Sequence, residues 1–524
     1  MFPSPKEQEP TVSTDNTENP TATVVSSIVV GCTAYPVTIT ATLMRRLPAV
    51  QITGLPASQV RETAERVRSA VSASGIEWPR QRVVIDVSHD APMTPSVTHL
   101  DLPIALAVLG AMGRVSQTKL DQWHPAGELS LSGQLRPFAG SLAMTRRVFS
   151  SGTDGHLPRF VVPSGVARRM SRVTGLDVLP FDNLEAVLLW HGGKLRCEPL
   201  PHGWLFTGDS GRCMSEVRGQ HEAKRAMAVA AVARLPIMLT GSPGSGKTML
   251  AARYNDILPH HDTAKLMASA CVHDAANLMH DGQSSFSRPF RAPHHTISSK
   301  GMVGSGTTVR PRPGEASLAH HGVLFLDELP EFSRAVIEQL SWVQRSVAEK
   351  GKISFERGSG PVSFPADFSL VVSTNPCPCG FDGHPSRRCD CSDEAKERYQ
   401  ARVTDHARSL GVGIAVNVTP VSHEEIAQEP DGDTSESIRE DVTAASQIYR
   451  QLRRTGTISF DAMRTLVQDP VTGRHDRRGA FDTALTIACA VAALDNHATV
   501  KDEHVREALD LLWAGDDTDN DGEE

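Results

Sequence analysis

The spacing of hydrophobic and polar residues changes several times along the chain. Apolar and polar positions alternate over residues 37–43, which predicts a strand. Apolar side chains then recur at helical spacing over residues 60–71, and a nearly continuous apolar stretch over residues 101–109 predicts a buried helix. Residues 127–133, with glycine at each end, are typical of a hairpin. We therefore expect residues 26–195 to form an α/β domain.

The two ends of the chain lack such a pattern. Residues 1–25 are rich in Thr, Pro, Glu and Asn and hold few large apolar side chains, so burial cannot offset the entropy of ordering them. Residues 514–524 are mostly acidic. We expect both ends to be disordered tails.

A second α/β domain is predicted over residues 215–420, joined to the first by a linker over residues 196–214. A polar stretch over residues 424–440 then precedes a helical segment, and residues 421–513 are expected to form a helical lid. Thr499 is the expected cap of the last helix. One apolar face of that helix is made by Val505, Ala508, Leu509 and Leu512.

Composition narrows the class of protein without identifying it. The chain has 524 residues, of which 40% are hydrophobic and 22% charged, and no apolar run approaches the roughly 18 to 20 residues of a membrane span. Nothing at the start resembles a secretory signal, so a soluble, cytoplasmic protein without membrane partners is expected. The formal net charge of −8 argues against a uniformly basic surface but permits a local basic channel for nucleic acid.

A glycine-rich loop carries the first candidate chemistry. An apolar strand is predicted over residues 235–240, and a helix follows the loop, the order that a phosphate-binding loop requires. Backbone N–H groups and the helix N-terminus would bind the phosphates of ATP, Lys247 would neutralise them, and the Thr248 hydroxyl would bind Mg²⁺. The residues expected to contact the nucleotide are Gly241, Ser242, Pro243, Gly244, Ser245, Gly246, Lys247, Thr248 and Met249.

Two further apolar strands end in polar side chains. Residues 322–328 place Asp327 and Glu328 after four apolar positions, which suits a Mg²⁺ ligand and a base that polarises the attacking water. Residues 369–375 end in Asn375, which would orient that water or the γ-phosphate, or alternatively serve as an ordinary turn residue. Lys247, Glu328 and Asn375 are thus the predicted catalytic residues.

Four of the nine cysteines are close together in the sequence: Cys377, Cys379, Cys389 and Cys391. Four thiolates at this spacing could bind a tetrahedral Zn²⁺ and fix the loop beside Asn375. Free thiols in a reducing compartment are the alternative.

Taken in order, these motifs resemble those of AAA+ ATPases, and further segments resemble the YifB/ComM family of Mg-chelatase-like ATPases. The segments are residues 217–220 (VRGQ), 291–298 (RAPHHTIS), 312–320 (RPGEASLAH), 322–332 (GVLFLDELPEF, which contains the predicted strand that ends in Asp327 and Glu328) and 375–380 (NPCPCG). Residues 54–56, 101–106 and 127–131 are similar to the Lon-protease-like, ribosomal S5 domain 2-like domain of that family.

The resemblance implies an AAA+ P-loop core with a helical lid, a homo-oligomeric ring with six subunits, and movement along single-stranded or branched DNA. It also implies nucleotide contacts from Gln220 and from a lid arginine, for which Arg478 is favoured over Arg474 and Arg477. Basic residues that could contact DNA, or merely face solvent, are Lys300, Arg310, Arg312, Lys350, Lys352 and Arg357.

One departure from the family pattern qualifies this interpretation, and two further segments bear on the function. The Asp-Arg pair whose arginine would reach a neighbour's γ-phosphate falls on Ser409 and Leu410, with Arg408 nearby, so turnover is expected to be weak. His294 and His295 would line a pore or subunit contact, or serve the structure alone. Residues 92–99 hold no lysine and no glycine-flanked serine, so peptidase chemistry is not expected.

A chelatase-type motor acting with a partner subunit and a nucleotide-gated scaffold are the alternatives to a DNA motor.

Overall fold

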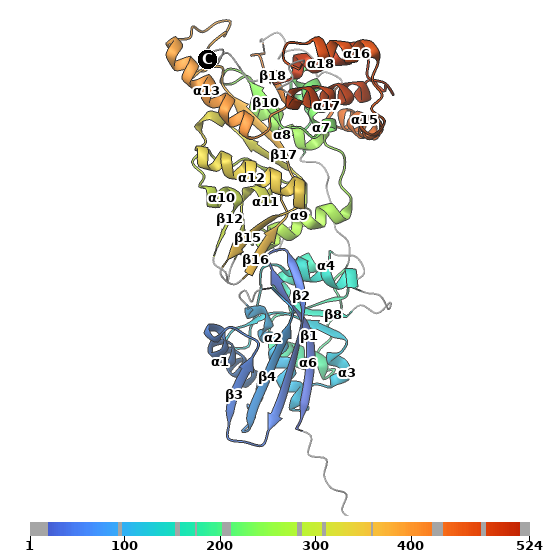
Figure 1. Cartoon of the computed structure of the whole chain (residues 1–524). Coiled ribbons are helices and arrows are strands. Elements are labelled where there is room, and N and C mark those ends of the chain that lie inside the picture. The colour runs from blue at the N-terminus through green and yellow to red at the C-terminus, as the bar shows by residue number, and fades with distance from the viewer. Residues whose placement is uncertain are drawn as a thin grey trace, which may run out of the picture. The chain divides into compact units, whose positions relative to one another are not determined.

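The computed structural model describes residues 19–92, 97–151, 158–172, 176–201, 211–279, 286–306, 311–357, 360–421, 433–472 and 478–513. The chain divides into two compact units (Figure 1). The first holds the residues up to 202 except residues 29–33 and 139–144, which group with the second unit, and the second holds the rest. The predicted tail at residues 514–524 and residues 93–96 of the peptidase segment lie outside the described residues.

The first unit is built on a four-stranded sheet of order β1-β2-β4-β3, in which β4 pairs antiparallel with β2 and parallel with β3. Alternate side chains of β2, among them Ile39 and Ala41, are buried, as its alternating pattern predicts. The strands are β1 (Thr21–Val30), β2 (Thr33–Met44), β3 (Ala49–Thr53) and β4 (Arg82–His89). Because β1 begins at Thr21, the predicted disordered tail over residues 1–25 is too long; its first 18 residues lie outside the described part.

Two helices of this unit match the predicted segments. The apolar stretch forms α2 (Asp101–Ala111), which is buried along almost its whole length, and α1 (Ala57–Ala73) buries Val67, Ala70 and Val71. The predicted hairpin is β6 (Glu128–Leu129) with β7 (Leu135–Arg136). A three-stranded parallel sheet, β5 (Trp123–Pro125), β8 (Arg159–Pro163) and β9 (Val178–Phe181), follows with α3 (Gln117–Leu120), α4 (Ser141–Ser151), α5 (Ser164–Met170) and α6 (Leu184–His191). The first unit runs to residue 202, seven residues beyond the predicted boundary at 195.

The second unit contains a five-stranded sheet of order β11-β14-β17-β10-β18, whose strands all pair in parallel. In β14, Val323 and Phe325 enter one hydrophobic cluster and Leu324 and Leu326 enter another, so both faces of the strand are covered. The strands are β11 (Phe290–Arg291), β14 (Val323–Leu326), β17 (Ser369–Thr374), β10 (Ile237–Thr240) and β18 (Ile414–Asn417). The continuous apolar runs seen in the sequence are thus buried parallel strands.

Helices and two hairpins surround this sheet. Helix α12 buries Val336, Ile337, Leu340 and Val343 along one stripe and ends at Gly351, whose φ of 68° only glycine adopts readily. The helices are α7 (His221–Ala233), α8 (Lys247–Ile257), α9 (Thr263–Ala275), α10 (Ser299–Val303), α11 (Glu315–Leu318), α12 (Arg334–Lys350) and α13 (Asp393–Ser409). The hairpins are β12 (Gly304–Gly306) with β13 (Pro311–Pro313), and β15 (Ile353–Arg357) with β16 (Gly360–Phe364).

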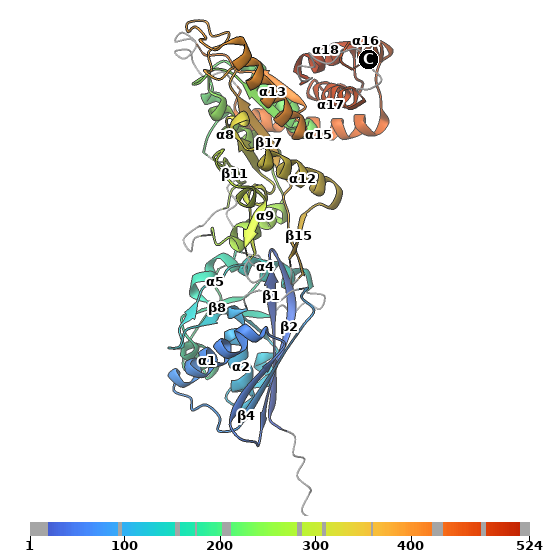
Figure 2. The same cartoon turned by 60° about the vertical axis from the view of Figure 1, so that its left-hand side comes forward.

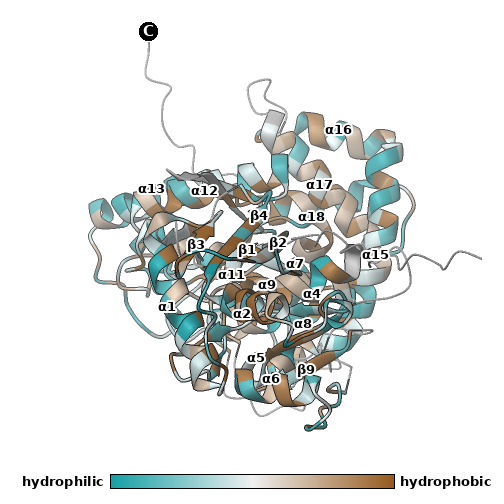
Figure 3. Cartoon of the chain, turned by 90° about the horizontal axis from the view of Figure 1, so that it is seen from below, coloured by the Kyte–Doolittle hydropathy of each residue, from teal (hydrophilic) through white to brown (hydrophobic). Residues whose placement is uncertain are grey.

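Figures 1 and 2 show the last four helices gathered as a group, in agreement with a helical lid. They are α15 (Ser435–Thr455), α16 (Phe460–Gln468), α17 (Arg478–Leu494) and α18 (Asp502–Leu511). In Figure 3, polar colouring is prominent on α15 and apolar colouring on α17. Two details of the prediction were wrong: α15 begins at Ser435, inside the expected polar stretch, and Lys501 rather than Thr499 is the N-cap of α18.

No helix in the described part of the chain is both long and apolar enough to cross a bilayer.

Candidate functional site

The glycine-rich loop joins β10 to α8 at the carboxyl edge of the sheet. Its glycines are needed for different steric reasons. A Cβ on Gly241 would lie 2.3 Å from the carbonyl oxygen of Val418, so no side chain fits there. Gly244 and Gly246 have φ of 80° and 100°, in the region that favours glycine. The sequence places these glycines where the backbone must turn tightly and expose its N–H groups at the start of α8.

Lys247, the first residue of α8, is 8% exposed and points back over the loop. Its Nζ donates to the carbonyl oxygens of Gly241 (2.6 Å) and Ser242 (3.0 Å) and to Oδ1 of Asn375 (3.1 Å). Burial lowers the pKa of Lys247, while Asp327 and Glu328 oppose that shift. The ammonium is therefore held among oxygen atoms where a phosphate would need it.

Two serines of the loop have unused hydrogen-bonding groups. The Oγ atoms of Ser242 and Ser245 are buried, and neither has a hydrogen-bond partner among the described residues. A buried hydroxyl without a partner costs roughly 1–3 kcal/mol, so such groups normally serve a ligand or another structural need. Together with the glycines and Lys247, these hydroxyls fit the phosphate oxygens of ATP.

Asp327 and Thr248 meet across the site. The Thr248 hydroxyl donates to Oδ2 of Asp327 at 3.2 Å, and the Ser373 hydroxyl donates to Oδ1 of the same carboxylate. A hydroxyl in the first turn of α8 and a carboxylate just after buried strand β14 face each other here, and both are ligands that Mg²⁺ accepts alongside phosphate oxygens. These two residues therefore fit the predicted Mg²⁺ site, and Ser373 is a supporting residue that the sequence did not single out.

Glu328 follows Asp327 in a backbone conformation that few non-glycine residues adopt. Its φ of 57° and ψ of 55° lie in the left-handed region, and its N–H donates to the Ser373 hydroxyl at 3.2 Å. Its carboxylate is half exposed and lies 3.6 Å from Nδ1 of His295. The backbone thus turns this side chain away from the core and toward the solvent side of the site, where water is available.

His295 lies next to Glu328 of the candidate site, a position that the sequence interpretation did not identify. The segment 291–298 suggested a pore, a subunit contact or a purely structural part, whereas the imidazole reaches the predicted catalytic glutamate. Its ring also packs edge-on against Phe332, and the neighbouring His294 shares a hydrogen bond with the Thr296 hydroxyl. Arg291 of the same segment is committed to a paired contact with Glu315 at 2.6 and 2.7 Å.

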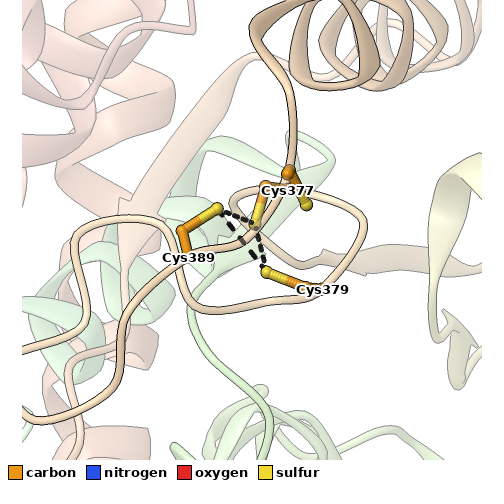
Figure 4. A group of neighbouring side chains, drawn as sticks. Cys377, Cys379 and Cys389 are labelled. Carbon is orange, nitrogen blue, oxygen red and sulfur yellow. Dashed lines mark hydrogen bonds between the residues drawn. The ribbon is translucent and has the colours of Figure 1, made fainter.

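The four-cysteine loop lies directly against the phosphate-binding loop. A Cβ on Gly380, whose φ is 82°, would meet Cδ of Pro243 at 2.5 Å and Cγ of Asn375 at 3.7 Å. The Sγ atom of Cys377 lies 3.4 Å from that of Cys379 and 3.6 Å from that of Cys389 (Figure 4). With Cys391, all four sulfur atoms lie within 4.8 Å of one another. The fold therefore brings together the four residues for which zinc was considered.

The structure gives less information on the other residues that the sequence predicts to contact the nucleotide: Gln220, Met249 and Arg478. The side-chain amide of Gln220 donates to the carbonyl oxygen of Thr419 at 2.6 Å, which ties it to the chain just after β18. Met249 is 40% exposed on the first turn of α8. Arg478 is the first residue of α17, but its side chain, like the whole of Arg474 and Arg477, lies outside the described part. Their contacts with a nucleotide stay predictions.

The position expected to hold a trans-acting arginine is occupied by Leu410. This residue caps the C-terminal end of α13 and is 2% exposed, so it cannot supply a guanidinium. Arg408 is exposed in the last turn of the same helix.

Basic side chains occur next to both hairpins of the second unit. Four of the six basic residues noted in the sequence are exposed: Lys300, Arg312, Lys350 and Lys352. Lys300 lies on α10, Arg312 on β13, Lys350 at the end of α12, and Lys352 just before β15. Arg310 lies outside the described residues, as does the side chain of Arg357.

Comparison with known proteins covers most of the chain. A family model described as magnesium chelatase, subunit ChlI, matches residues 213–426, and a second, described as subunit ChlI of Mg-chelatase, matches residues 39–165. The protein YifB of Escherichia coli is 32% identical over 501 residues, which cover 91% of this chain and 94% of that protein. The competence protein ComM of Haemophilus influenzae is 32% identical over 450 residues, 84% of each.

A solved structure from Cytophaga hutchinsonii, described only provisionally as an ATPase, is similar at 12% identity and a TM-score of 0.34. It covers 57% of this chain and 82% of that one. This likeness is too weak to bear on the fold or the chemistry.

Proposed function

The chain belongs to the YifB/ComM family of Mg-chelatase-like AAA+ ATPases, and we propose that it hydrolyses ATP to drive remodelling of DNA. The observation that carries the ATPase part is the convergence of four groups at one sheet edge: Lys247 and Thr248 after β10, Asp327 after β14 and Asn375 after β17. These groups come from separate parts of the sequence and contact one another in two pairs, Lys247 with Asn375 and Thr248 with Asp327, which supports the proposed roles.

The proposed roles follow from charge and position. Phosphoryl transfer depends mainly on positioning and on stabilising charge, and Mg²⁺, when bound, would neutralise charge on the phosphates. Thr248 and Asp327 would hold the metal, and Lys247 would bind phosphate oxygens. Asn375, already in contact with Lys247, would orient the γ-phosphate or the attacking water.

Glu328 is proposed to accept a proton from the attacking water. Its carboxylate is half exposed, and its geometry is constrained on one side by Ser373 and on the other by His295. A base must lie within hydrogen-bond reach of the water whose proton it accepts, and the left-handed backbone at Glu328 turns it toward that space.

The DNA part of the proposal is supported by two observations. The relative from Haemophilus influenzae is named a competence protein, and four exposed lysine and arginine side chains stand on or beside the two hairpins. Such side chains can contact phosphates of single-stranded or branched DNA without reading its sequence. Action in a homo-oligomeric ring of six subunits belongs to the same proposal, and so does a cytoplasmic location.

A chelatase-type motor that acts through a partner subunit is the second candidate, because both family models carry the description of a chelatase subunit. A nucleotide-gated scaffold is the third, because buried Leu410 stands where a trans-acting arginine is expected. An arginine finger contributes about 10³ to 10⁵ in kcat, so a chain without a substitute would turn over very slowly.

Steady-state ATP hydrolysis by wild type and Glu328→Gln, each with and without single-stranded and branched DNA, separates these candidates. We expect DNA to stimulate the wild type and the variant to bind ATP but lose turnover. Turnover that no DNA changes would favour the chelatase-type motor. ATP binding without turnover on any DNA would overturn the motor proposal in favour of the scaffold.

A further inference from the structure

The loop between β17 and α13 gathers four thiols from its two arms. Cys377 and Cys379 come from one arm and Cys389 and Cys391 from the other. The sulfur–sulfur distances of 3.4 and 3.6 Å are far longer than the roughly 2.05 Å of a disulfide. They are close to the edge of about 3.8 Å in a tetrahedron of sulfurs around Zn²⁺ with bonds of about 2.3 Å.

We propose that Cys377, Cys379, Cys389 and Cys391 bind one Zn²⁺, and that this centre positions Asn375 and the phosphate-binding loop for ATP hydrolysis. The second half of this statement rests on the proposed ATPase function; the metal site stands on its own geometry.

The donor set selects the metal. Four sulfur donors and no nitrogen or oxygen donor make up the group, which favours a soft or borderline ion such as Zn²⁺ over Mg²⁺ or Ca²⁺. On binding, each thiol loses its proton to solvent as its sulfur forms a bond to the metal, and no electron is transferred. Four protein ligands fill a tetrahedral site, so the proposed role is structural rather than catalytic.

The loop lacks the regular structure and the hydrophobic core that would otherwise stabilise it. Residues 375–392 contain no helix or strand, and they are rich in Pro, Gly and charged side chains that cannot form a core. Its hydrogen bonds to α13 include the side-chain amide of Gln400 to the carbonyl oxygen of Pro376 (2.6 Å) and Lys396 to Asp382 (2.7 Å). Four metal–sulfur bonds would close the two arms of the loop on one another.

Closing the loop would act directly on the ATP site. Cys377 is two residues from Asn375, whose Oδ1 accepts from Lys247, and Gly380 packs against Pro243 of the phosphate-binding loop. The cysteine centre thus adjoins both elements, one through the chain and one through packing. Loss of the metal would leave both of them less well ordered, which lowers turnover.

The metal half is tested on the full-length chain without an activity assay. We expect purified protein to contain close to one Zn²⁺ per chain, and expect a Co²⁺-substituted sample to show the intense sulfur-to-cobalt charge-transfer absorption of a tetrahedral thiolate site. Cys379→Ser and Cys391→Ser should lose both signals, whereas Cys197→Ser, a part-buried cysteine of the first unit, should keep them.

Wild-type protein that neither retains zinc nor gives the cobalt spectrum at one equivalent overturns the site, and this test does not depend on whether a variant folds. The absence of zinc and of the cobalt spectrum would mean either that the four cysteines are free thiols or that they form disulfides. Counting the thiols under denaturing conditions distinguishes these two cases.

The positioning half is tested by two glycines of the same loop. Gly380→Ala would push a methyl group into Pro243, whereas Gly383→Ala, at a similar φ of 72°, meets nothing within 4 Å. Both variants should keep their zinc. We expect Gly380→Ala to lower kcat by about 10- to 100-fold, the usual cost of disturbing residues that support a site, and Gly383→Ala to change it far less.

Equal kcat values for the two variants, with zinc retained in both, would overturn the positioning role and leave the metal site standing. Wild type with full zinc and no turnover would instead indicate that the ATPase proposal has failed.

Discussion

The ammonium of Lys247 donates to Oδ1 of Asn375 at 3.1 Å, although 128 positions separate the two residues in the sequence. The contact follows from the sheet. Strands β10 and β17 are parallel neighbours with Thr240 opposite Thr374, so the residues that follow them emerge side by side at one edge. This contact favours the proposed role of Asn375 in the phosphate site over that of an ordinary turn residue.

Replacing Lys247 tests the centre of the site. We expect Lys247→Ala to weaken ATP binding and to abolish hydrolysis, because it removes the buried cation that contacts Gly241, Ser242 and Asn375. Fluorescent nucleotide titration and steady-state hydrolysis measure the two effects. Lys194→Ala, which removes an exposed lysine of the first unit, controls for loss of charge alone. ATP binding and turnover equal to wild type in Lys247→Ala would remove the nucleotide-site assignment.

His295 is expected to hold the carboxylate of Glu328 in place. His295→Ala should lower kcat by about tenfold, the order of a disturbed supporting contact, with a smaller change in KM. His294→Ala is the neighbouring comparison: its ring lies on that of His295, with 4.0 Å between the ring centroids, and shares a hydrogen bond with the Thr296 hydroxyl, so we expect it to lower kcat less than His295→Ala does. If both alanine variants lower kcat equally, the effect belongs to the segment as a whole and the specific role of His295 is refuted.

Alanine at Gly241 or at Gly244 tests two different effects of a side chain in the same loop: steric crowding at Gly241 and an unfavourable positive φ at Gly244. A methyl group on Gly241 would lie 2.3 Å from the Val418 carbonyl oxygen and 2.8 Å from the Ser245 hydroxyl, so the loop must shift. We expect Gly241→Ala to cost about 1–3 kcal/mol of stability, as overpacking does, and to weaken ATP binding at least tenfold. Gly244→Ala meets nothing within 4 Å and should mainly carry the strain of its positive φ. Melting temperature and nucleotide titration of both variants decide this.

The first unit is expected to lose stability on mild acidification. Burial lowers the pKa of His124 and of His99 from the ordinary value near 6.5 to about 4. The unfolded chain therefore binds more protons than the folded chain between pH 6.5 and 4, and stability falls as the pH drops through that window. The loss at pH 5 amounts to about 2 kcal/mol per histidine.

Thermal unfolding of wild type and His124→Gln at pH 7.5 and pH 5 checks the acid dependence. The variant should lose less stability between the two pH values, because Gln can keep the hydrogen bond to Ser27 without titrating. A wild-type melting temperature that does not change between these pH values would contradict the prediction.

Lys350 and Lys352 are expected to contact DNA phosphates. The double variant Lys350→Glu and Lys352→Glu should bind DNA more weakly, and the slope of log affinity against log salt should decrease by roughly one for each lysine that no longer binds a phosphate. Lys194→Glu, an exposed lysine of the first unit, provides the control. Fluorescence anisotropy over a salt series measures both quantities, and an unchanged slope would exclude these two lysines from the DNA interface.

The sequence alone determined the elements that carry the chemistry. The strand, glycine-rich loop and helix around Lys247 were predictable from the local sequence. The apolar run, the spacing of the glycines and the lysine–threonine pair all lie within a few residues of one another. The acidic strand ending at Asp327 and Glu328 was predictable for the same reason, and so was the buried helix α2. Local pattern was less exact at boundaries, as the start of β1 at Thr21 and the Lys501 cap of α18 show.

Only the tertiary structure decided which distant residues meet. Sheet order places Asn375 beside Lys247, the turn after β14 brings Glu328 to His295, and the loop after β17 closes its four cysteines next to Pro243. The spacing of the cysteines and the position of Asn375 at a strand end suggested roles for these residues, but the partners His295 and Pro243 left no such signal, because those contacts depend on the packing of strands and loops that are remote in the chain. Short-range periodicity determines the elements, whereas the burial of both faces of a parallel sheet determines their neighbours.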